Sequence, residues 1–473
     1  MIEFWTWFVE DHLYEYIGGY MFLTLALALF TGLPVAIALG GVSLIWGLIA
    51  IWLDILDMNI FFGVINRIWG GDGASGAVQN PILVAIPLFV FMGTMLERSR
   101  VAADLLHILQ IMLKRVPGGL ALAVTVMGTI MAATTGIIGA SVVMMTLLAL
   151  PVMLERSYNL PLATGTIAAS GTLGILIPPS IMLVIMSDLM SIPVGTVFIA
   201  AILPGLLLST LYSVYIYAVS HLKPQLAPPL PERYAPVGGL AFAAMLVRSF
   251  LPPVLLIVVV LGSIFAGIAT PTEAAGIGAL GATLLALGNG ALSWPTLRDV
   301  CYRSALTTAM LFGIFLGATA FSVMFRFLGG EHLIIEFIQS LGVSPWVILF
   351  SLMAMVFLLG FFFDWIEITL IVLPVFAPIV SNPQLVDLSA HIPQQTEVII
   401  WFTILVAVNL QTSFLTPPFG FALFYMKGVA PPAVTIQHIY RGIVPFVALQ
   451  LVGLGLCIAF PEIVLWLPRA LLQ

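Results

Sequence analysis

Long apolar runs recur along almost the whole chain, and they decide which solvent the fold must face. Residues 197–219, 346–363 and 444–460 are three of them, and each approaches the roughly 20 consecutive residues that a helix needs to cross a hydrocarbon core. With 61% hydrophobic and 8% charged residues, the chain lacks the polar groups to cover a soluble domain, which is about one quarter charged. The sequence therefore predicts an all-α polytopic membrane protein with roughly 10 to 13 spans.

Several chemistries are excluded by what the sequence lacks. The net charge of -6 is thinly spread, and no basic stripe interleaved with aromatic residues points to a nucleic-acid partner. The six histidines form no zinc or haem motif, and no phosphate-binding lysine frame of an ATPase occurs. We therefore expect no enzyme, no cofactor and no transition metal, with an ion gradient as the simplest source of energy for any transport.

A polar, proline-laden stretch, KPQLAPPLPERYAP at residues 223–236, divides the chain into two halves of similar hydrophobic content. The expected segments are an N-terminal scaffold segment at 1–80, a first repeat at 81–222, the linker at 223–236, scaffold and the start of a second repeat at 237–330, and the second repeat at 331–473.

The two halves share a pattern that indicates internal duplication. Residues 141–153 and 364–376 have the same apolar texture with proline at the same place, and residues 171–180 match 410–419, each with a Pro-Pro pair. Chance similarity among apolar segments is the alternative. The shared order of the two breaks favours two inverted structural repeats, as many secondary transporters have.

The Pro-Pro pairs are Pro178-Pro179 and Pro417-Pro418. Proline lacks a backbone donor and clashes with the preceding turn, so each pair predicts a discontinuous helix. Inside a membrane, the freed backbone groups must be satisfied by protein, ions or water in a cavity. A mere kink or loop end is the alternative for each pair taken alone.

Asp364 and Glu367 stand inside the apolar run at residues 356–375. A carboxylate at membrane depth costs about 3 kcal/mol on insertion scales, so it is expected to face a cavity or a cation. We interpret Asp364 as an ion ligand, or as the charge that sets sodium affinity, at the tip of a re-entrant hairpin. A carboxylate that snorkels from a helix end to interfacial water is the alternative for both residues.

Six blocks of the sequence resemble the large membrane (M) subunit of TRAP transporters, the DctM-like family. They include IPPS near Pro178 and TPPFG near Pro417, and they occupy, in the family's order, residues 86–93, 117–126, 168–181, 267–279, 360–364 and 409–424. The resemblance implies an elevator-type importer, with a scaffold and a transport domain carrying two re-entrant hairpins. It also implies Na+ as coupling ion and a small organic acid as substrate.

The resemblance further implies three partners in the bacterial inner membrane and periplasm. These are the lipid bilayer, a small four-helix membrane (Q) subunit, which we expect not to be fused to this chain, and a soluble periplasmic substrate-binding (P) protein. Two other classes stay open: a binding-protein-independent carboxylate or oxyanion transporter of another inverted-repeat family, and a membrane-embedded enzyme.

Carried over residue by residue, the family's two ion sites fall on the two hairpin tips and the two helix breaks. The expected sodium-binding residues are Gly136, Gly139, Ser141, Gly171, Thr172, Gly174, Asp364, Thr412, Ser413 and Thr416. The expected residues of the helix breaks and substrate cavity are Pro178, Pro179, Ser180, Pro417, Pro418 and Gly420.

Overall fold

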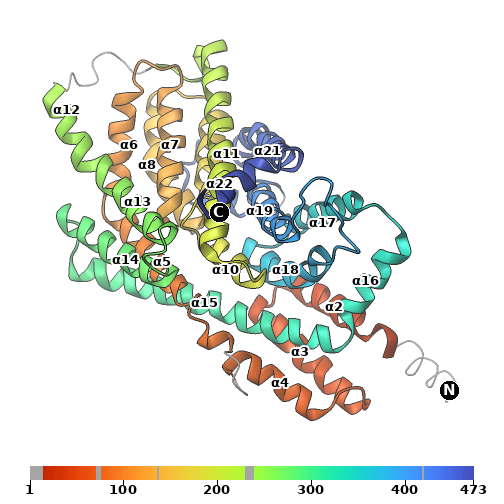
Figure 1. The fold of residues 1–473 in the computed structure, drawn as a ribbon. Coiled ribbons are helices and arrows are strands. Elements are labelled where there is room, and N and C mark those ends of the chain that lie inside the picture. Colours follow the sequence, from red (N-terminus) through yellow and green to blue (C-terminus); the bar gives the residue numbers. More distant parts are fainter. Residues whose placement is uncertain (1–13, 71–75, 136–137, 230–238, 418–419, 473) are drawn as a thin grey trace. The chain divides into compact units, whose positions relative to one another are not determined.

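The computed structural model of the protein describes residues 14–70, 76–135, 138–229, 239–417 and 420–472, and these residues form helices joined by turns and loops, without a strand (Figure 1). Seven of the described helices are long and apolar enough to cross a membrane, and six further apolar helices are shorter. The prediction of an all-α polytopic membrane protein is confirmed. The expected 10 to 13 spans are not all continuous helices, because several apolar runs are divided between shorter ones.

The chain forms two compact units, each assembled from separate stretches of sequence. Unit 1 comprises Met1–Leu83, Thr307–Leu352 and Ile366–Ile399, and unit 2 comprises Val84–Leu306, Met353–Trp365 and Ile400–Gln473. Both units therefore draw on both halves of the sequence. The segment boundaries expected from the sequence stay a prediction, and the part of the linker at 230–236 lies outside the described residues.

Unit 1 contains the N-terminal helices and the first part of the second half. Its elements are α2 (Tyr14–Phe30), α3 (Val35–Trp52), α4 (Met58–Trp69), η2 (Ala77–Gln79), the second part of α15 (Trp294–Phe327), α16 (Gly330–Leu341), most of α17 (Pro345–Leu359), nearly all of α18 (Trp365–Ser381) and the start of α19 (Gln395–Ser413). Small residues bring its helices together, since a Cβ atom on Gly317 of α15 would lie 2.6 Å from the carbonyl oxygen of Ala36 in α3.

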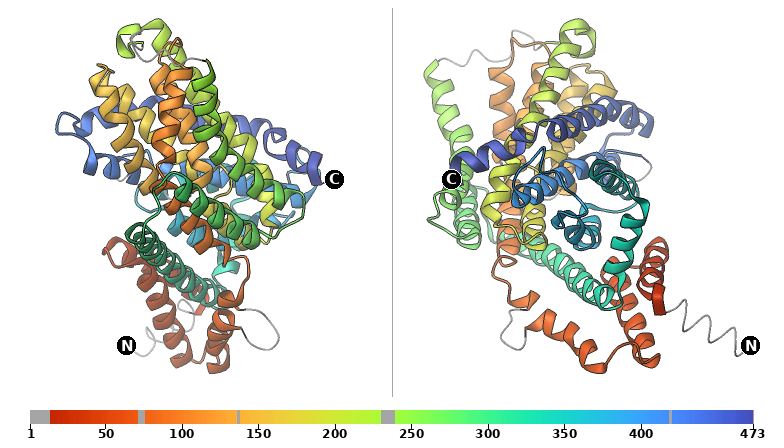
Figure 2. Two further views of the ribbon diagram at one scale, coloured as in Figure 1. Left: turned by 90° about the vertical axis from the view of Figure 1, so that its left-hand side faces the viewer. Right: turned by 45° about the vertical axis from the view of Figure 1, so that its right-hand side comes forward.

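Unit 2 holds most of the first half and the C-terminal helices. Its elements up to the middle of the chain are α5 (Ala85–Arg98), α6 (Val101–Met112), α7 (Gly119–Thr135), α8 (Ile138–Glu155), α9 (Leu160–Thr172), η3 (Leu173–Ile175), α10 (Ile181–Leu189), α11 (Val194–Leu222), η4 (Pro224–Leu226), α12 (Gly239–Met245), η5 (Leu246–Phe250), α13 (Leu251–Phe265) and α14 (Pro271–Gly288). The start of α15 and the ends of α17 and α19 follow, with α20 (Phe421–Val429), α21 (Ile436–Ala459) and α22 (Glu462–Leu472). Helices α6, α7 and α8 lie side by side in Figures 1 and 2.

Capping residues fix several helix boundaries in unit 2. The Asn159 side chain accepts a hydrogen bond from the backbone N–H of Leu162 and caps α9. Thr270 and Glu273 form a capping box at α14, with Pro271 in the first turn. Such capping residues mark where a helix begins when the sequence is apolar on both sides of the boundary.

The same order of elements occurs twice along the chain. Helices α7 and α8 are followed by the interrupted pair α9 and α10, then by the long helix α11. Helices α17 and α18, the pair α19 and α20, and the long α21 follow in the same order. The inverted symmetry of the two sets and an elevator motion stay predictions.

Both Pro-Pro pairs fall where the structure interrupts a helix. Residues 176–180 separate η3 from α10, and the Pro178-Pro179 bond there is cis. The second interruption separates α19, which ends at Ser413, from α20, which begins at Phe421. Discontinuous helices are therefore confirmed at both places, although Pro418 itself lies outside the described residues.

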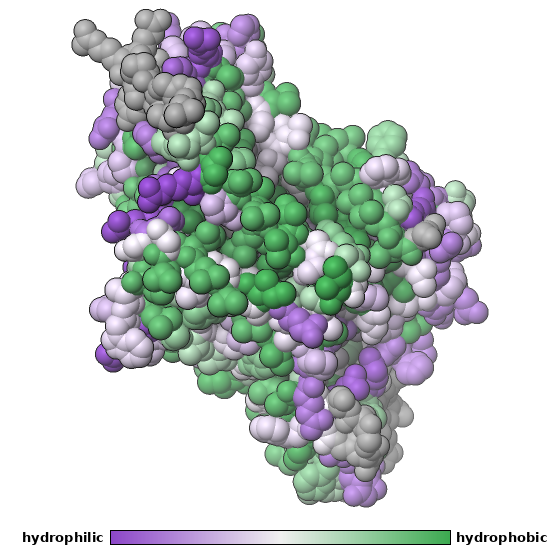
Figure 3. Space-filling model, turned by 60° about the vertical axis from the view of Figure 1, so that its left-hand side comes forward, coloured by the Kyte–Doolittle hydropathy of each residue, from purple (hydrophilic) through white to green (hydrophobic). Residues whose placement is uncertain are grey.

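The surface of the protein is rich in apolar side chains, as a lipid-facing surface requires. Hydrophobic residues cover much of the face drawn in Figure 3. In α13, for example, Leu251, Leu255, Val258 and Val259 are all exposed. An exposed apolar surface of this extent would aggregate in water, and the bilayer is the solvent that accommodates it.

Candidate functional site

All of the predicted site residues that the structure describes lie in unit 2. Those of the first half come from the stretch 84–306, Asp364 comes from 353–365, and Thr412 to Gly420 come from 400–473. Gly136 and Pro418 lie outside the described residues. The fold thus collects into one compact unit the described candidates, which the sequence spreads from Gly139 to Gly420.

The first group of candidates lies where α8 packs against the end of α9. A Cβ atom on Gly171 would lie 2.6 Å from Cγ2 of Val142, so α9 approaches α8 this closely only because residue 171 has no side chain. Ser141, beside this contact in α8, is buried, as are Thr172 and Gly174. The packing therefore keeps a hydroxyl of α8 next to the end of α9.

The hydroxyls of this first group donate hydrogen bonds to nearby backbone carbonyl oxygens. Thr172 Oγ1 donates to the carbonyl oxygen of Ala169 at 2.9 Å, and Ser180 Oγ donates to the carbonyl oxygen of Ile175 across the break. Such donations leave lone pairs on both hydroxyl oxygens. They can therefore serve as hard oxygen ligands for a cation without losing these hydrogen bonds.

The second group lies at the end of α19 and repeats this chemistry. Thr412 Oγ1 donates to the carbonyl oxygen of Asn409 at 2.6 Å, and Thr416 Oγ1 donates to the carbonyl oxygen of Thr412. Gly420, which precedes α20, is buried, whereas Pro417 is exposed. The break in α19 thus gathers hydroxyl and unwound carbonyl oxygens, as the first break does.

Asp364 lies in the turn between α17 and α18, at the tip position predicted from the sequence. Its Oδ1 accepts a hydrogen bond from the backbone N–H of Trp365 at 2.7 Å, and the residue is half-buried. This carboxylate at the start of α18 is favourably placed with respect to the helix dipole. Asp364 is therefore the charged residue among the candidate sodium ligands.

The tip of the second hairpin packs directly on the second helix break. A Cβ atom on Gly360 would lie 1.8 Å from Oγ of Ser413, and Asn409 Nδ2 donates to the carbonyl oxygen of Met353 at 2.7 Å. These two contacts fasten the end of α17 to the end of α19. They place Gly360, four residues before Asp364, against Ser413 at the end of α19.

Helix α20 connects the second break with the first hairpin. Helices α8 and α20 are in contact, and a Cβ atom on Gly139 would lie 3.0 Å from the ring of Tyr425. The start of α8, which carries Gly139 and Ser141, therefore lies against the helix that follows Gly420. The structure brings the two groups of candidates together within unit 2.

Gln411 was missed by the sequence reasoning. Its side chain is fully buried, and neither amide atom has a hydrogen-bond partner among the described residues. The same holds for Oγ of Ser413. Buried polar atoms without a partner are rare and costly, and the binding of an ion or a water molecule is one of the ordinary reasons for them. The sequence did contain a signal for Gln411, because this residue aligns with the candidate ligand Thr172 in the internal repeat.

Replacing Gln411 with leucine is expected to leave the sodium-free protein as stable as before, or more stable by about 1 kcal/mol, because an unsatisfied amide is removed from the interior. If sodium binds at these oxygens and the amide oxygen is one of its ligands, the stabilisation of the protein by sodium relative to potassium should fall to less than about half. Thermal unfolding of the purified protein in detergent measures both effects. Gln450→Leu, which removes a buried amide in α21, is the control and should keep the full sodium response.

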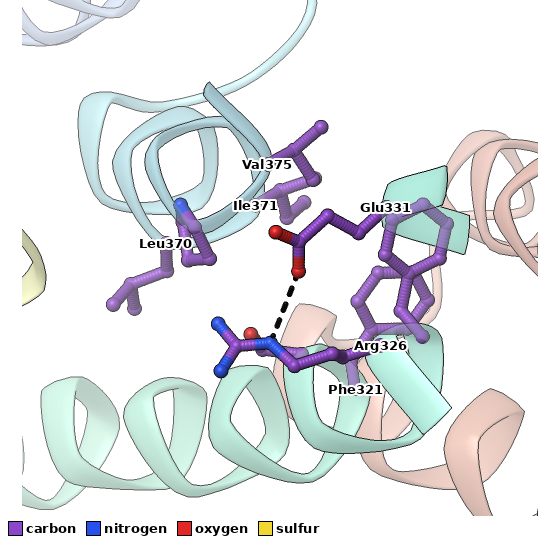
Figure 4. Close-up of a pocket in the computed structure, with 9 residues that line it drawn as sticks. Phe321, Arg326, Glu331, Leu370, Ile371 and Val375 are labelled. Carbon is purple, nitrogen blue, oxygen red and sulfur yellow. Dashed lines mark ion pairs between the residues drawn. The ribbon is translucent and has the colours of Figure 1, made fainter. Parts of the chain in front are cut away.

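Glu367 belongs to unit 1 and is not part of this group. Unit 1 has a separate small pocket, drawn in Figure 4, in which Arg326 and Glu331 form an ion pair of 3.3 Å. Leu370, Ile371 and Val375 of α18 line the same pocket. It pairs one exposed cation with one anion and contains none of the predicted site residues.

Comparison with known proteins decides the family. The family model described as "Tripartite ATP-independent periplasmic transporter, DctM component" matches residues 22–463. The chain belongs to this DctM family. It is accordingly a TRAP transporter large permease and a multi-pass protein of the bacterial inner membrane, and its family is one of transporter permeases rather than enzymes.

The DctM relatives differ in the substrates that their names give. The C4-dicarboxylate TRAP transporter large permease protein DctM of Pseudomonas aeruginosa is 31% identical over 398 residues, covering 83% of this chain and 87% of that protein. The ectoine/5-hydroxyectoine large permease UehC of Ruegeria pomeroyi is 28% identical, covering 94% and 97%. The isethionate permease DctMQ of Oleidesulfovibrio alaskensis is also 28% identical, covering 93% of this chain and 64% of that protein.

Among solved structures, the YdaH transporter of Alcanivorax borkumensis, described as having an unusual topology, is similar to this DctM chain. The TM-score is 0.59 at 15% sequence identity, and the match covers 92% of this chain and 98% of that one. At this identity the likeness concerns the fold alone.

Proposed function

We propose that the chain is the large membrane subunit of a sodium-coupled, binding-protein-dependent secondary importer of small organic acids. The observation that carries this proposal is the meeting of both helix breaks and the Asp364 tip in unit 2. Membership of a tripartite transporter family and the absence of an ATPase motif in the sequence agree with it. The proposal needs an ion to supply the energy, and sodium is the ion that this donor set fits.

The oxygens of the site fit a desolvated alkali cation. Thr412 and Thr416 keep lone pairs after donating to backbone carbonyls, and unwound backbone at the two breaks adds carbonyl oxygens. These are hard ligands of the type that discontinuous helices offer to sodium in secondary transporters. A nearby carboxylate, Asp364, raises cation affinity because it is costly to leave at membrane depth without a positive partner.

The substrate is proposed to be a small organic acid. The relatives named above carry C4-dicarboxylate, ectoine or isethionate in their names, and all three are small polar compounds with an acidic group. Helices α10 and α20 begin directly after the breaks, so their N-terminal dipole ends favour an anion there. Bound sodium would add positive charge beside the same groups.

Transport is proposed to follow an elevator mechanism, in which the unit with the site moves against a fixed scaffold. Unit 2 is the candidate moving part, because it contains every described site residue. The proposed partners are a small four-helix membrane subunit and a periplasmic binding protein that delivers the acid. Lipid surrounds the remaining apolar surface.

Uptake by reconstituted proteoliposomes tests the proposed function. The acid is first chosen by a thermal-shift screen of the cognate binding protein against C4-dicarboxylates, hydroxy acids and sulfonates. Uptake should then require an inward sodium gradient, both membrane subunits and the binding protein. Uptake that continues unchanged with potassium in place of sodium would reject the coupling. Uptake without the binding protein would favour the transporter class that needs none.

Thr416→Val should weaken the apparent sodium affinity of uptake by about fivefold. The reason is that valine keeps the shape of the side chain and removes one oxygen ligand, worth about 1 kcal/mol. A sodium titration of uptake measures the effect. Thr210→Val, at an exposed hydroxyl of α11 that bonds its own helix, is the matched control. An unchanged titration in Thr416→Val would show that this oxygen does not bind sodium.

A further inference from the structure

In unit 2, the turn between α14 and α15 packs against the turn between α5 and α6. The side-chain amide of Asn289, which ends α14, donates to the carbonyl oxygen of Ser99 at 3.0 Å. Arg98 Nη2 of α5 lies 2.6 Å from Asp299 Oδ2 of α15. Helices α5 and α14 are themselves in extensive contact (Figure 1). The two turns therefore bring together an arginine cluster, made of Arg98, Arg100, Arg298 and Arg303.

The arginine cluster is only partly neutralised. Arg98 and Arg303 share Asp299, and Arg303 Nε lies 3.0 Å from each carboxylate oxygen. Arg100 and Arg298 are exposed, and the side chain of neither forms an ion pair or a hydrogen bond with another described residue. The other acidic residues of these turns are Glu97 and Asp104. The cluster thus stays positive and presents two guanidinium groups whose donors can bind an anion.

Exposed leucines lead away from the cluster along both helices. On α14, Leu280, Leu284 and Leu287 are spaced three or four positions apart, so they lie on one face, and each is more than half exposed. This leucine row ends just before Asn289. On α15, Leu306 is also more than half exposed. An anion that binds the arginines therefore has apolar surface beside it.

Two exposed aromatic residues flank Arg298 on the surface of α15. Trp294 and Tyr302 precede and follow it by four positions, so the three side chains share one face of the helix. Trp294 is 75% exposed and Tyr302 is 65% exposed. In membrane proteins, tryptophan and tyrosine gather at the level of the lipid headgroups, and arginines gather on the cytoplasmic side. This surface is accordingly typical of the cytoplasmic headgroup region.

We propose that the arginine cluster binds the headgroup phosphate of an anionic phospholipid from the cytoplasmic leaflet. The guanidinium groups of Arg100 and Arg298 donate to the phosphate oxygens, and an acyl chain lies along the leucine row of α14. A soluble phosphate compound would use the arginines and leave the leucines uncovered, which is why the ligand is a lipid. The site does not depend on the sodium coupling proposed above.

Lipid binding to the purified, delipidated protein tests the site. Phosphatidylglycerol and phosphatidylcholine with the same acyl chains are titrated in detergent, and bound lipid is counted by native mass spectrometry. Arg100→Gln and Arg298→Gln should each weaken phosphatidylglycerol binding by about fivefold, and added salt should weaken it in the wild type. Both arginines are exposed, so the variants should fold. Arg441→Gln, at an exposed arginine of α21, is the control.

A preference for phosphatidylglycerol that the double variant Arg100→Gln/Arg298→Gln loses and Arg441→Gln retains supports the site. Equal binding of the two lipids to the wild type, an unchanged preference in the monodisperse double variant, or an equal loss in Arg441→Gln overturns it. Glycerol 3-phosphate carries a phosphate without acyl chains and should not displace the bound lipid. If it displaces the lipid as well as phosphatidylglycerol does, the ligand is a soluble phosphate compound and the proposed lipid site is wrong.

Discussion

Gly442→Ala, which adds a single methyl group, is expected to destabilise the protein strongly. In α21, a Cβ atom on Gly442 would lie 2.2 Å from the carbonyl oxygen of Pro161 and 2.9 Å from the backbone nitrogen of Gly165. Both atoms belong to the backbone of α9, which cannot move aside as a flexible side chain would. We expect a loss of about 3 kcal/mol or more, seen as a lower thermal midpoint and a smaller yield of monodisperse protein.

The control for this prediction lies in the same helix. A Cβ atom on Gly455 would meet nothing within 4 Å, and alanine favours a helix over glycine by about 1 kcal/mol. Gly455→Ala should therefore keep or raise the thermal midpoint. Equal midpoints for the two variants would mean that α9 and α21 do not pack as closely as the structure shows.

Asp364→Asn is expected to lower the apparent sodium affinity of uptake by about tenfold or more, which corresponds to about 1.4 kcal/mol. Asparagine keeps the size of the side chain and an oxygen that can accept from the N–H of Trp365, so the turn between α17 and α18 should fold. The variant lacks the negative charge that favours a cation at membrane depth. A sodium titration of uptake, with expression matched to the wild type, measures the loss.

Asp387→Asn removes the same charge from an exposed loop residue, whose carboxylate accepts from the backbone N–H of Ser389 at 3.0 Å. Its sodium titration should match that of the wild type. If well-expressed Asp364→Asn also matches the wild type, Asp364 is not a sodium ligand. The snorkelling carboxylate considered from the sequence would then be the better description.

The parts of the fold that the sequence predicted correctly are those with a local chemical cause. The two Pro-Pro pairs interrupt helices because proline cannot continue one, whatever surrounds it. The carboxylate of Asp364 marks a hairpin tip because its charge is costly among apolar residues. Each of these signals can be recognised within a few residues.

The errors have the opposite origin. The run at residues 346–363 was expected to be one span, but α17 ends at Leu359. Its turn is built from Gly360 and three phenylalanines, so hydropathy does not change where the helix stops. Contacts between distant segments were equally hidden. The packing of Tyr425 on Gly139, of Gly442 on α9, and the burial of Gln411 depend on which helices meet, and no local pattern encodes that.

The assignment of helices to the two units could not be predicted from the sequence. Unit 2 combines residues 84–306 with 353–365 and 400–473, and no local pattern shows that these stretches pack together. Long-range packing of small residues, such as Gly165 of α9 against Gly442 of α21, holds such segments together. Apolar helices that are interchangeable in composition are distinguished only by these complementary surfaces.

An experimental structure determined in sodium and the transported acid would show whether the two helix breaks form one sodium and substrate site. We predict cation density beside Ser141 and Gly171 to Gly174, and beside Asp364 and Thr412 to Thr416, with the acid close to both. Replacing sodium with potassium should remove that density. If the two breaks are far apart, or pack against neighbouring helices without a cation while uptake remains sodium-dependent, they do not form one site.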